Sequence, residues 1–293
     1  MKALAALIVL ALIGAGAFWR LSAPSRLDPS IAAEMDKPGD AHNGAVVFWI
    51  AGCAACHAKS ADEPLKLGGG KELETPFGPI TPPNISPDPE DGIGNWSAQK
   101  FARAIYDGVD DEGEHLYPAF PYPSYRRMSV ADVRDLWAFL RGLPKVRGES
   151  PPPGFGFPFN IRRTIGVWKW LYLTRATPPE AVAVADTADY GRYLVQGPGH
   201  CGECHTPRDF LGGPNADKAL TGARMPDGKG KSHDITPLGL EAWTQSDIEL
   251  ALTTGITPDG DSLGGAMAEV VRNLSRLPKA NITAIARYLK AGR

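Results

Sequence analysis

The sequence contains few residues with a sulfur atom or an imidazole ring. Its 293 residues include four cysteines, five methionines and six histidines. All four cysteines lie in two copies of the pattern C-x-x-C-H, at Cys53–His57 and Cys201–His205. No cysteine is left for a disulfide bond, an iron–sulfur cluster or a catalytic thiol.

The chain also lacks an excess of charge of either sign. It has 31 basic and 33 acidic residues, a formal net charge of -2, so we expect no nucleic-acid partner. The 33 glycines and 27 prolines are typical of loop-rich domains. Such a composition suits small domains in which a cofactor forms much of the core.

The C-x-x-C-H pattern is the attachment signature of a c-type haem, in which the histidine becomes the proximal iron ligand. A zinc ribbon would place its second cysteine pair about 15–20 residues after the first, whereas 145 positions separate Cys56 from Cys201. A thioredoxin-like site would follow a β-strand, and glycines interrupt both flanking segments. We therefore predict two covalently bound haem c groups. Their predicted protein ligands and attachment residues are Cys53, Cys56, His57, Cys201, Cys204 and His205.

The N-terminal segment from Ala3 to Trp19 is uncharged and apolar. As a helix, its residues rise about 1.5 Å each, enough to reach close to the thickness of a bilayer core. Cleavage as a signal peptide is the alternative, because Ala15–Ala17 resembles an A-x-A site. Trp19 and Arg20 are typical of a membrane edge and favour a retained anchor over residues 1–20. Both alternatives place the motifs on the periplasmic side of the bacterial inner membrane.

The two halves of the chain repeat each other at an offset of 147 to 149 residues. The matching pairs are Cys53 and Cys201, Trp96 and Trp243, Gly108 and Gly255, and Phe139 and Tyr288. We predict an all-α protein with two tandem class I-like cytochrome c domains and an N-terminal transmembrane helix. The expected parts are an anchor over 1–20, a tether over 21–38, a first domain over 39–147, a linker over 148–179 and a second domain over 180–293.

Capping residues predict several of the helices. The segment 43–50 suits a helix that leads to Cys53, Ser97 is a good N-cap for a helix that ends at Gly108, and Ser129 begins another. The linker contains an aromatic segment over 160–174. We interpret it as an interdomain helix buried against both domains, and the alternative is a surface that contacts a partner or the membrane.

Methionine is the usual sixth ligand of a low-spin electron-transfer haem. In the second half, Met267 lies in a glycine-containing loop after the Trp243 helix and is favoured over Met225, which follows His205 by only 20 residues. In the first half, the corresponding position is Phe120, which cannot bind iron. Met128 is the available sulfur there, and His115 is the alternative ligand.

Three further residues are candidates for contact with haem. Trp96 and Trp243 repeat in the two halves and would pack on a haem edge or donate a hydrogen bond to it, although packing in the core explains them equally well. Arg208 would pair with a haem propionate, and a solvated surface position is its alternative.

Several motifs resemble a known family. They are Thr75–Gly78, Asn84–Asp88, Gly92–Ser97, Tyr117–Tyr122 and Gly202–Arg208. These segments are similar to those of the multihaem cytochrome c subunits of bacterial periplasmic dehydrogenases that oxidise alcohols, gluconate, aldehydes or N-heterocycles. The segment Met267–Val271 also matches the family's ligand-bearing stretch, whereas Phe120 departs from the usual Pro-Ala-Met-Pro-Tyr. With two motifs and an N-terminal anchor, the chain resembles the dihaem subunits that pair with molybdenum-type dehydrogenases.

The resemblance implies a function in electron transfer. Electrons from a catalytic subunit that carries molybdenum, flavin or a quinone cofactor would pass through the haems to a downstream cytochrome, oxidase or quinone acceptor. The residues themselves then carry no catalytic role. The alternatives are a dihaem enzyme, such as a thiosulfate dehydrogenase or a peroxidase, and a haem-based sensor.

Overall fold

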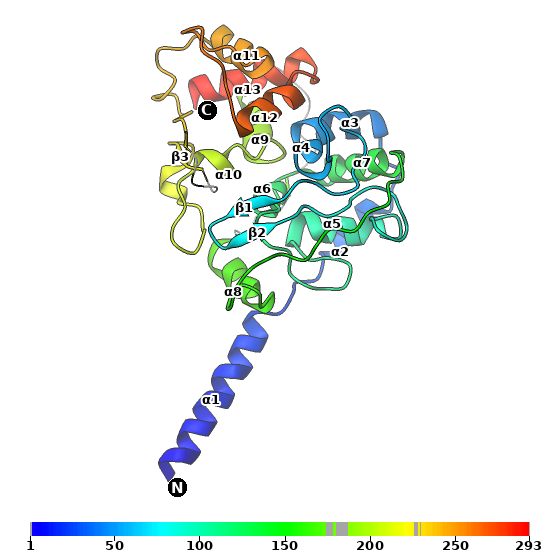
Figure 1. Cartoon of the computed structure of the whole chain (residues 1–293), viewed down its shortest axis with the longest axis vertical. Coiled ribbons are helices and arrows are strands. Elements are labelled where there is room, and N and C mark those ends of the chain that lie inside the picture. The colour runs from blue at the N-terminus through cyan, green and yellow to red at the C-terminus, as the bar shows by residue number, and fades with distance from the viewer. Residues whose placement is uncertain (1, 174–177, 180–186, 226–227, 229, 293) are drawn as a thin grey trace.

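In the computed structural model, the chain forms a helical head from which a single long helix projects (Figure 1). The structure describes residues 2–173, 178–179, 187–225, 228 and 230–292. Helix α1 (Lys2–Leu21) forms the projection and has no buried residue. Within these residues it is the one helix that is long and apolar enough to cross a membrane. The predicted domain boundary at 180, the linker residue Thr174 and the terminal Arg293 lie outside the described residues.

The first half of the head, which we call the N-terminal lobe, consists of α2 to α7 and a hairpin. Its elements are α2 (Pro29–Met35), α3 (Ala41–Ile50), α4 (Cys53–His57), β1 (Leu73–Thr75), β2 (Gly78–Ile80), α5 (Ala98–Asp107), α6 (Tyr122–Tyr125) and α7 (Val130–Arg141). The predicted caps are present, because Ser97 accepts a bond from the backbone of Lys100 and Ser129 one from that of Asp132. Gly108 ends α5 in the left-handed conformation, with φ of 58°.

The expected tether over 21–38 differs from the structure, which contains helix α2 there. Asp28 caps this helix by accepting a bond from the backbone of Ser30, and Pro29 follows at the first helical position. Ile31 and Met35, one turn apart, are buried in the core of the N-terminal lobe. The segment is therefore part of the lobe, and the Asp-Pro pair was the start signal that the sequence offered.

The second half of the head, the C-terminal lobe, is built around a second hydrophobic core, which also includes Ile50 of α3. It contains α9 (Ala188–Gln196), α10 (Gly202–His205), the 3-10 helix η1 (Ala216–Lys218), β3 (Ala223–Arg224), β4 (Lys231–Ser232), α11 (Gln245–Thr254), α12 (Ala266–Leu274) and α13 (Lys279–Ala291). The strands form two antiparallel hairpins, β1 with β2 and β3 with β4. These short hairpins are the departure from a purely helical fold.

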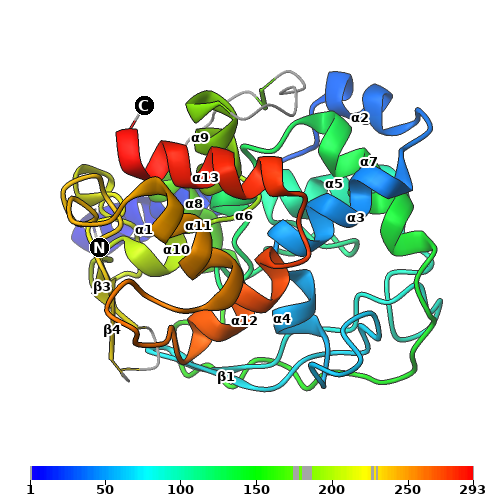
Figure 2. The ribbon, with the colours of Figure 1, turned by 90° about the horizontal axis from the view of Figure 1, so that it is seen from above.

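One helix crossing is built in the same way in both lobes. Figure 2 shows α3 beside α7 and α9 beside α13. A Cβ atom on Gly44 of α3 would lie 2.0 Å from the carbonyl oxygen of Asp135 in α7. A Cβ atom on Gly191 of α9 would lie 1.9 Å from the carbonyl oxygen of Ala284 in α13. Only glycine allows the two backbones to approach so closely.

We predict that Gly191→Ala destabilises the C-terminal lobe. The added methyl group overlaps a carbonyl oxygen, so the helices must separate, at a cost of about 1–3 kcal/mol or more. Gly156→Ala is the control, because nothing lies within 4 Å of the position of its Cβ atom, and it should change the free energy of unfolding by less than about 0.5 kcal/mol. Denaturant unfolding followed by circular dichroism measures both. Equal stability of the two variants would show that the crossing is not tight.

Helix α8 (Arg163–Tyr172), in the predicted linker, contacts both lobes. The Nζ atom of Lys169 lies 2.6 Å from the carbonyl oxygens of Asp107 and Gly108 in the N-terminal lobe. Trp168 donates a hydrogen bond from Nε1 to the carbonyl oxygen of Leu211 in the C-terminal lobe, at 3.0 Å. The interpretation as an interdomain helix buried against both lobes therefore holds for one side of α8, whereas Trp170 and Leu171 are exposed.

The ammonium group of Lys169 is buried at the C-terminal end of α5. Its three donors face the two carbonyl oxygens and Nδ1 of His115, which lies 3.0 Å from Nζ. Burial lowers the pKa of Lys169 to about 7, while a cation at this end of a helix interacts favourably with its carbonyl groups.

We predict that Lys169→Met lowers the free energy of unfolding by about 1–3 kcal/mol, because the buried acceptors lose their donor. Methionine retains much of the apolar stem, so the loss reports on the hydrogen bonds. Lys66→Met is the control, since the Lys66 side chain is 54% exposed and pairs only with Glu63 at the surface. Urea unfolding compares the two, and equal midpoints would contradict the assigned role.

Candidate haem centres

Each C-x-x-C-H motif folds into a short helical turn. The first motif forms α4, and a left-handed Gly52 with φ of 66° precedes it. The second begins at Cys201 and continues through α10. A helical turn places residues three and four apart on one side, so each turn brings two thiols and one imidazole together. This is the donor set that covalent haem attachment requires.

A backbone carbonyl group fixes the orientation of each motif histidine. Nδ1 of His57 lies 2.7 Å from the carbonyl oxygen of Pro83, and Nδ1 of His205 lies 2.7 Å from that of His233. Since a carbonyl oxygen only accepts, Nδ1 carries the proton in each ring and Nε2 keeps its lone pair for iron. Burial lowers the pKa of both histidines, which favours the neutral form that binds metals.

The residues that supply these carbonyl groups were not predicted as site residues. Pro83 precedes Asn84-Ile85-Ser86-Pro87, and His233 precedes Asp234-Ile235-Thr236-Pro237, so the two segments match at an offset of 150. This second repeat was the available signal. It means that a short loop, rather than a side chain, supports the proximal ligand in each lobe.

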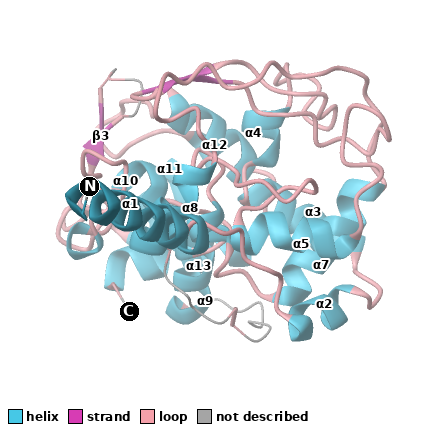
Figure 3. Cartoon of the chain, turned by 90° about the horizontal axis from the view of Figure 1, so that it is seen from below, coloured by secondary structure: helices cyan, strands magenta, loops and turns pink. Residues whose placement is uncertain are grey.

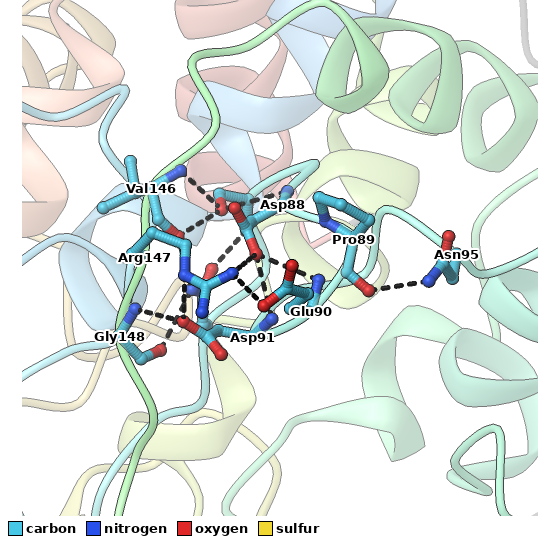
Figure 4. Close-up of polar contacts among 10 residues, drawn as sticks. Asp88, Pro89, Glu90, Asp91, Asn95, Val146, Arg147 and Gly148 are labelled. Carbon is cyan, nitrogen blue, oxygen red and sulfur yellow. Dashed lines mark hydrogen bonds and ion pairs between the residues drawn. The ribbon is translucent and has the colours of Figure 1, made fainter.

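In the N-terminal lobe, a network of charged and polar groups holds this loop against the segment that follows α7 (Figure 4). Nε of Arg147 lies 3.0 Å from the carboxylate of Asp91, and its Nη1 also pairs with Glu90. The amide of Asn84, next to Pro83, donates to the carbonyl oxygen of Val146 at 2.7 Å. The loop whose carbonyl group orients His57 is therefore held against Val146 and Arg147, which follow α7.

Met267 lies in the first turn of α12, where it is half-buried against the core of the C-terminal lobe. Trp243 packs against the same core. The alternative Met225 lies directly after β3, and its backbone bonds to Gly228 and Gly230 in the connection to β4. The structure thus brings Met267, and not Met225, to the edge of a core cluster.

Met128 lies within the core of the N-terminal lobe, where it is 1% exposed. Its carbonyl oxygen accepts a hydrogen bond from the hydroxyl of Tyr106 at 3.2 Å. It immediately precedes the N-cap of α7, as Leu277 immediately precedes that of α13, and Leu277 is also buried. A core position is therefore shared by both lobes, and ligation by Met128 stays a prediction.

His115 is buried at the junction of the N-terminal lobe with α1 and α8. Its Nε2 atom donates to the carbonyl oxygen of Ser22 at 2.8 Å, and its Nδ1 atom faces Lys169. Both ring nitrogens are thus occupied by protein groups, so binding iron would require this junction to open.

The remaining predicted contacts have structural partners. Trp96 and Trp243 each precede a helix N-cap and pack, partly buried, on the core of their lobe, as in a hydrophobic staple. Arg208 pairs with Glu203 and donates to the carbonyl oxygen of Gly212 at 2.8 Å. Contact of these three side chains with haem stays a prediction.

The two C-x-x-C-H turns lie close together where the lobes meet. The carbonyl oxygen of Ala51, just before the first motif, accepts from the hydroxyl of Tyr125 at 2.6 Å and faces Nε2 of His200 at 3.2 Å. Ser124 donates to the carboxylate of Glu203, inside the second motif, at 2.6 Å. Burial raises the pKa of the Cys56 thiol, and the nearby Cys204 of the other motif adds to this effect.

Two C-x-x-C-H turns, each with its histidine fixed through Nδ1, define a c-type cytochrome. The Cytochrome c family model matches residues 41–144. A dihaem cytochrome c-type protein of Cereibacter sphaeroides is 45% identical over 292 residues, which cover 98% of this chain and 96% of that protein. The chain therefore belongs to the family of dihaem c-type cytochromes.

Other relatives are subunits of dehydrogenases. A nicotinate dehydrogenase subunit of Pseudomonas putida is 37% identical over 241 residues, which cover 82% of this chain and 20% of that protein. The fructose dehydrogenase cytochrome subunit of Gluconobacter japonicus is 36% identical over 264 residues, 87% of this chain and 54% of the relative. The chain thus spans only part of these two proteins but almost all of the dihaem cytochrome.

Proposed function

We propose that this protein carries electrons from the catalytic subunit of a periplasmic dehydrogenase to the respiratory chain. Its family relationship to cytochrome subunits of dehydrogenases supports this function. Bound haem would supply a one-electron ferric/ferrous couple at each site. Cys53, Cys56 and His57 would hold one haem, and the corresponding residues of the second motif, in a second cytochrome c domain formed by the C-terminal lobe, would hold the other.

The observation that carries the proposal is the contact between the two attachment turns. The carbonyl oxygen of Ala51, just before the first motif, lies 3.2 Å from Nε2 of His200, just before the second. Two haems attached there would share one interface between the lobes, which suits the transfer of single electrons from a two-electron donor. Met267, and in the N-terminal lobe Met128, would complete the coordination and raise the potential of the haems.

The exposed surface of α1 supports attachment of the protein to a membrane. All described residues of this helix are exposed in the structure, and an apolar surface of this size is stable only when something covers it. A bilayer matches its length, since twenty residues rise about 30 Å. The head would then stand at the membrane surface, between the dehydrogenase and a membrane-bound acceptor.

The relatives named above give no support to the alternative of a dihaem thiosulfate dehydrogenase or peroxidase. They are cytochromes or subunits of dehydrogenases.

Extraction from native membranes with a mild detergent tests the proposed function. We expect a dehydrogenase catalytic subunit to co-purify with the chain, and we expect one substrate among alcohols, sugars, sugar acids, aldehydes and N-heterocycles to reduce both haems. Purification of the chain alone, with haems that stay oxidised in membranes supplied with each substrate, would contradict it.

A further inference from the structure

Outside α1, exposed apolar side chains are concentrated in one short stretch of the sequence. Outside α1, the described residues include ten exposed large hydrophobic side chains, and five of them lie between residues 157 and 171. We call these five the apolar patch: Phe157, Phe159, Ile161, Trp170 and Leu171. Phe157 is 82% exposed and Trp170 is 62% exposed. Single exposed hydrophobic residues are normal, but a cluster indicates a surface that contacts something else.

The outer side of α8 carries part of this patch. The inner side is buried through Ile165, Trp168 and Lys169, whereas the side chains of Trp170 and Leu171 are more than half exposed. The helix is therefore apolar on two sides, and neither lobe covers the outer one. Some other apolar environment would be needed to cover it.

Helix α8 also contacts the C-terminal end of α1. Arg163 donates to the carbonyl oxygen of Trp19 at 2.8 Å and to the hydroxyl of Ser22 at 2.9 Å, and its guanidinium lies 4.2 Å from the centre of the Trp19 ring. A Cβ atom on Gly166 would lie 2.5 Å from the carbonyl oxygen of Ser22, so the two backbones touch. Figures 1 and 3 show α8 at the point where α1 leaves the head.

These contacts fix the depth of the patch. Trp19 and Arg20 end the apolar helix, and residues of this kind lie at the level of the lipid headgroups. Arg163 binds directly to Trp19, so the N-terminal end of α8 lies at nearly the same level. When α1 is inserted, this end of the helix has a bilayer surface next to it.

We propose that the apolar patch is a second membrane contact, in which α8 and the loop before it lie in the interfacial region of the outer leaflet. The inference rests on the proposed anchor. Trp and Phe are favoured at this depth. Two contacts, the spanning helix and the patch, hold the head in one orientation toward the membrane.

Lipid photolabelling of the full-length holoprotein in nanodiscs tests this inference. The probe is a phospholipid with a diazirine close to the glycerol end of one acyl chain, and labelled peptides are identified by mass spectrometry. We expect label in α1 and in residues 157–171, and none in α11. The paired change Trp170→Glu and Leu171→Glu should abolish label in α8. Leu250→Glu in α11 is the matched control, because Leu250 is 49% exposed and Leu171 is 51% exposed.

The outcomes separate this inference from the anchor on which it rests. Label in α1 with none in 157–171 would overturn the membrane contact and leave the anchor in place. In that case, hydrogen–deuterium exchange of the backbone amides of residues 157–171 would be measured next. If these amides became protected only when a dehydrogenase catalytic subunit was added, the patch would be a protein-docking surface instead. Label in 157–171 with none in α1 would support the contact and contradict the anchor. The haem content and the visible spectrum of each variant show whether the head is intact.

Discussion

Replacing Cys201 and Cys204 together with serine is expected to remove one of two covalently bound haems and to leave the other in place. Serine cannot form the thioether bonds that tether the porphyrin. The N-terminal lobe has its own core, its own attachment turn and its own bond from His57 to Pro83, so its haem does not depend on the second motif. The haem content per chain should therefore fall by half.

The reciprocal change, Cys53→Ser with Cys56→Ser, is the matched control and should leave only the second haem. Covalent haem is measured from the absorbance of the alkaline pyridine complex and from the intact mass after acid extraction of loose haem. A chain that carries one haem before any change would contradict the two-site account. So would the loss of both haems from either variant at full expression of folded protein.

Replacing Met267 with leucine is expected to convert the second haem from a low-spin to a high-spin centre that binds carbon monoxide. Leucine has nearly the same size, so the packing of α12 on the C-terminal core should persist. The sulfur ligand is lost, and the midpoint potential of that haem should fall by on the order of 0.1 V or more, within the roughly 0.8 V range that axial ligands span.

Met225→Leu is the control for this change, because Met225 lies in the connection between β3 and β4. This variant should leave the spectra of both haems unaltered. Electron paramagnetic resonance and a redox titration distinguish the two variants. A normal low-spin second haem in Met267→Leu would contradict the assignment.

Met128→Leu tests the first haem in the same way. If Met128 binds iron, the first haem becomes high-spin. If the haem stays low-spin, Met128 has the core role of its counterpart Leu277, and another residue binds the iron. His115→Gln tests the alternative ligand, and we expect it to loosen the contact with Ser22 while the spectrum of the first haem is retained.

Local signals in the sequence predicted helices α5 and α7. Ser97 and Ser129 begin α5 and α7 because a hydroxyl group can satisfy a free backbone donor, which is a property of a few neighbouring residues. The glycine that ends α5 at Gly108 follows the same logic, since its φ is positive. The predicted helix over 43–50 lies within α3, which leads to the first C-x-x-C-H turn.

The features that were missed depend on contacts between distant segments. The bond from His57 to Pro83 joins residues 26 positions apart, and nothing in either residue alone indicates it. Arg163 and His115 both bond to Ser22, from 141 and 93 positions away. These contacts, which hold the residue that follows α1, form only in the folded chain. Helix α2 was missed for a different reason, because a seven-residue helix shows too little periodicity to stand out from a tether.

The electron-transfer role is tested most directly by following both haems in the purified complex with its dehydrogenase. The oxidised complex is mixed anaerobically with the dehydrogenase substrate in a stopped-flow instrument, and the reduced-haem absorbance is recorded against time. We predict that both haems become reduced and that the motif variants retain only the signal of the remaining haem. Haems that stay oxidised with substrate, although dithionite reduces them fully, would contradict the account.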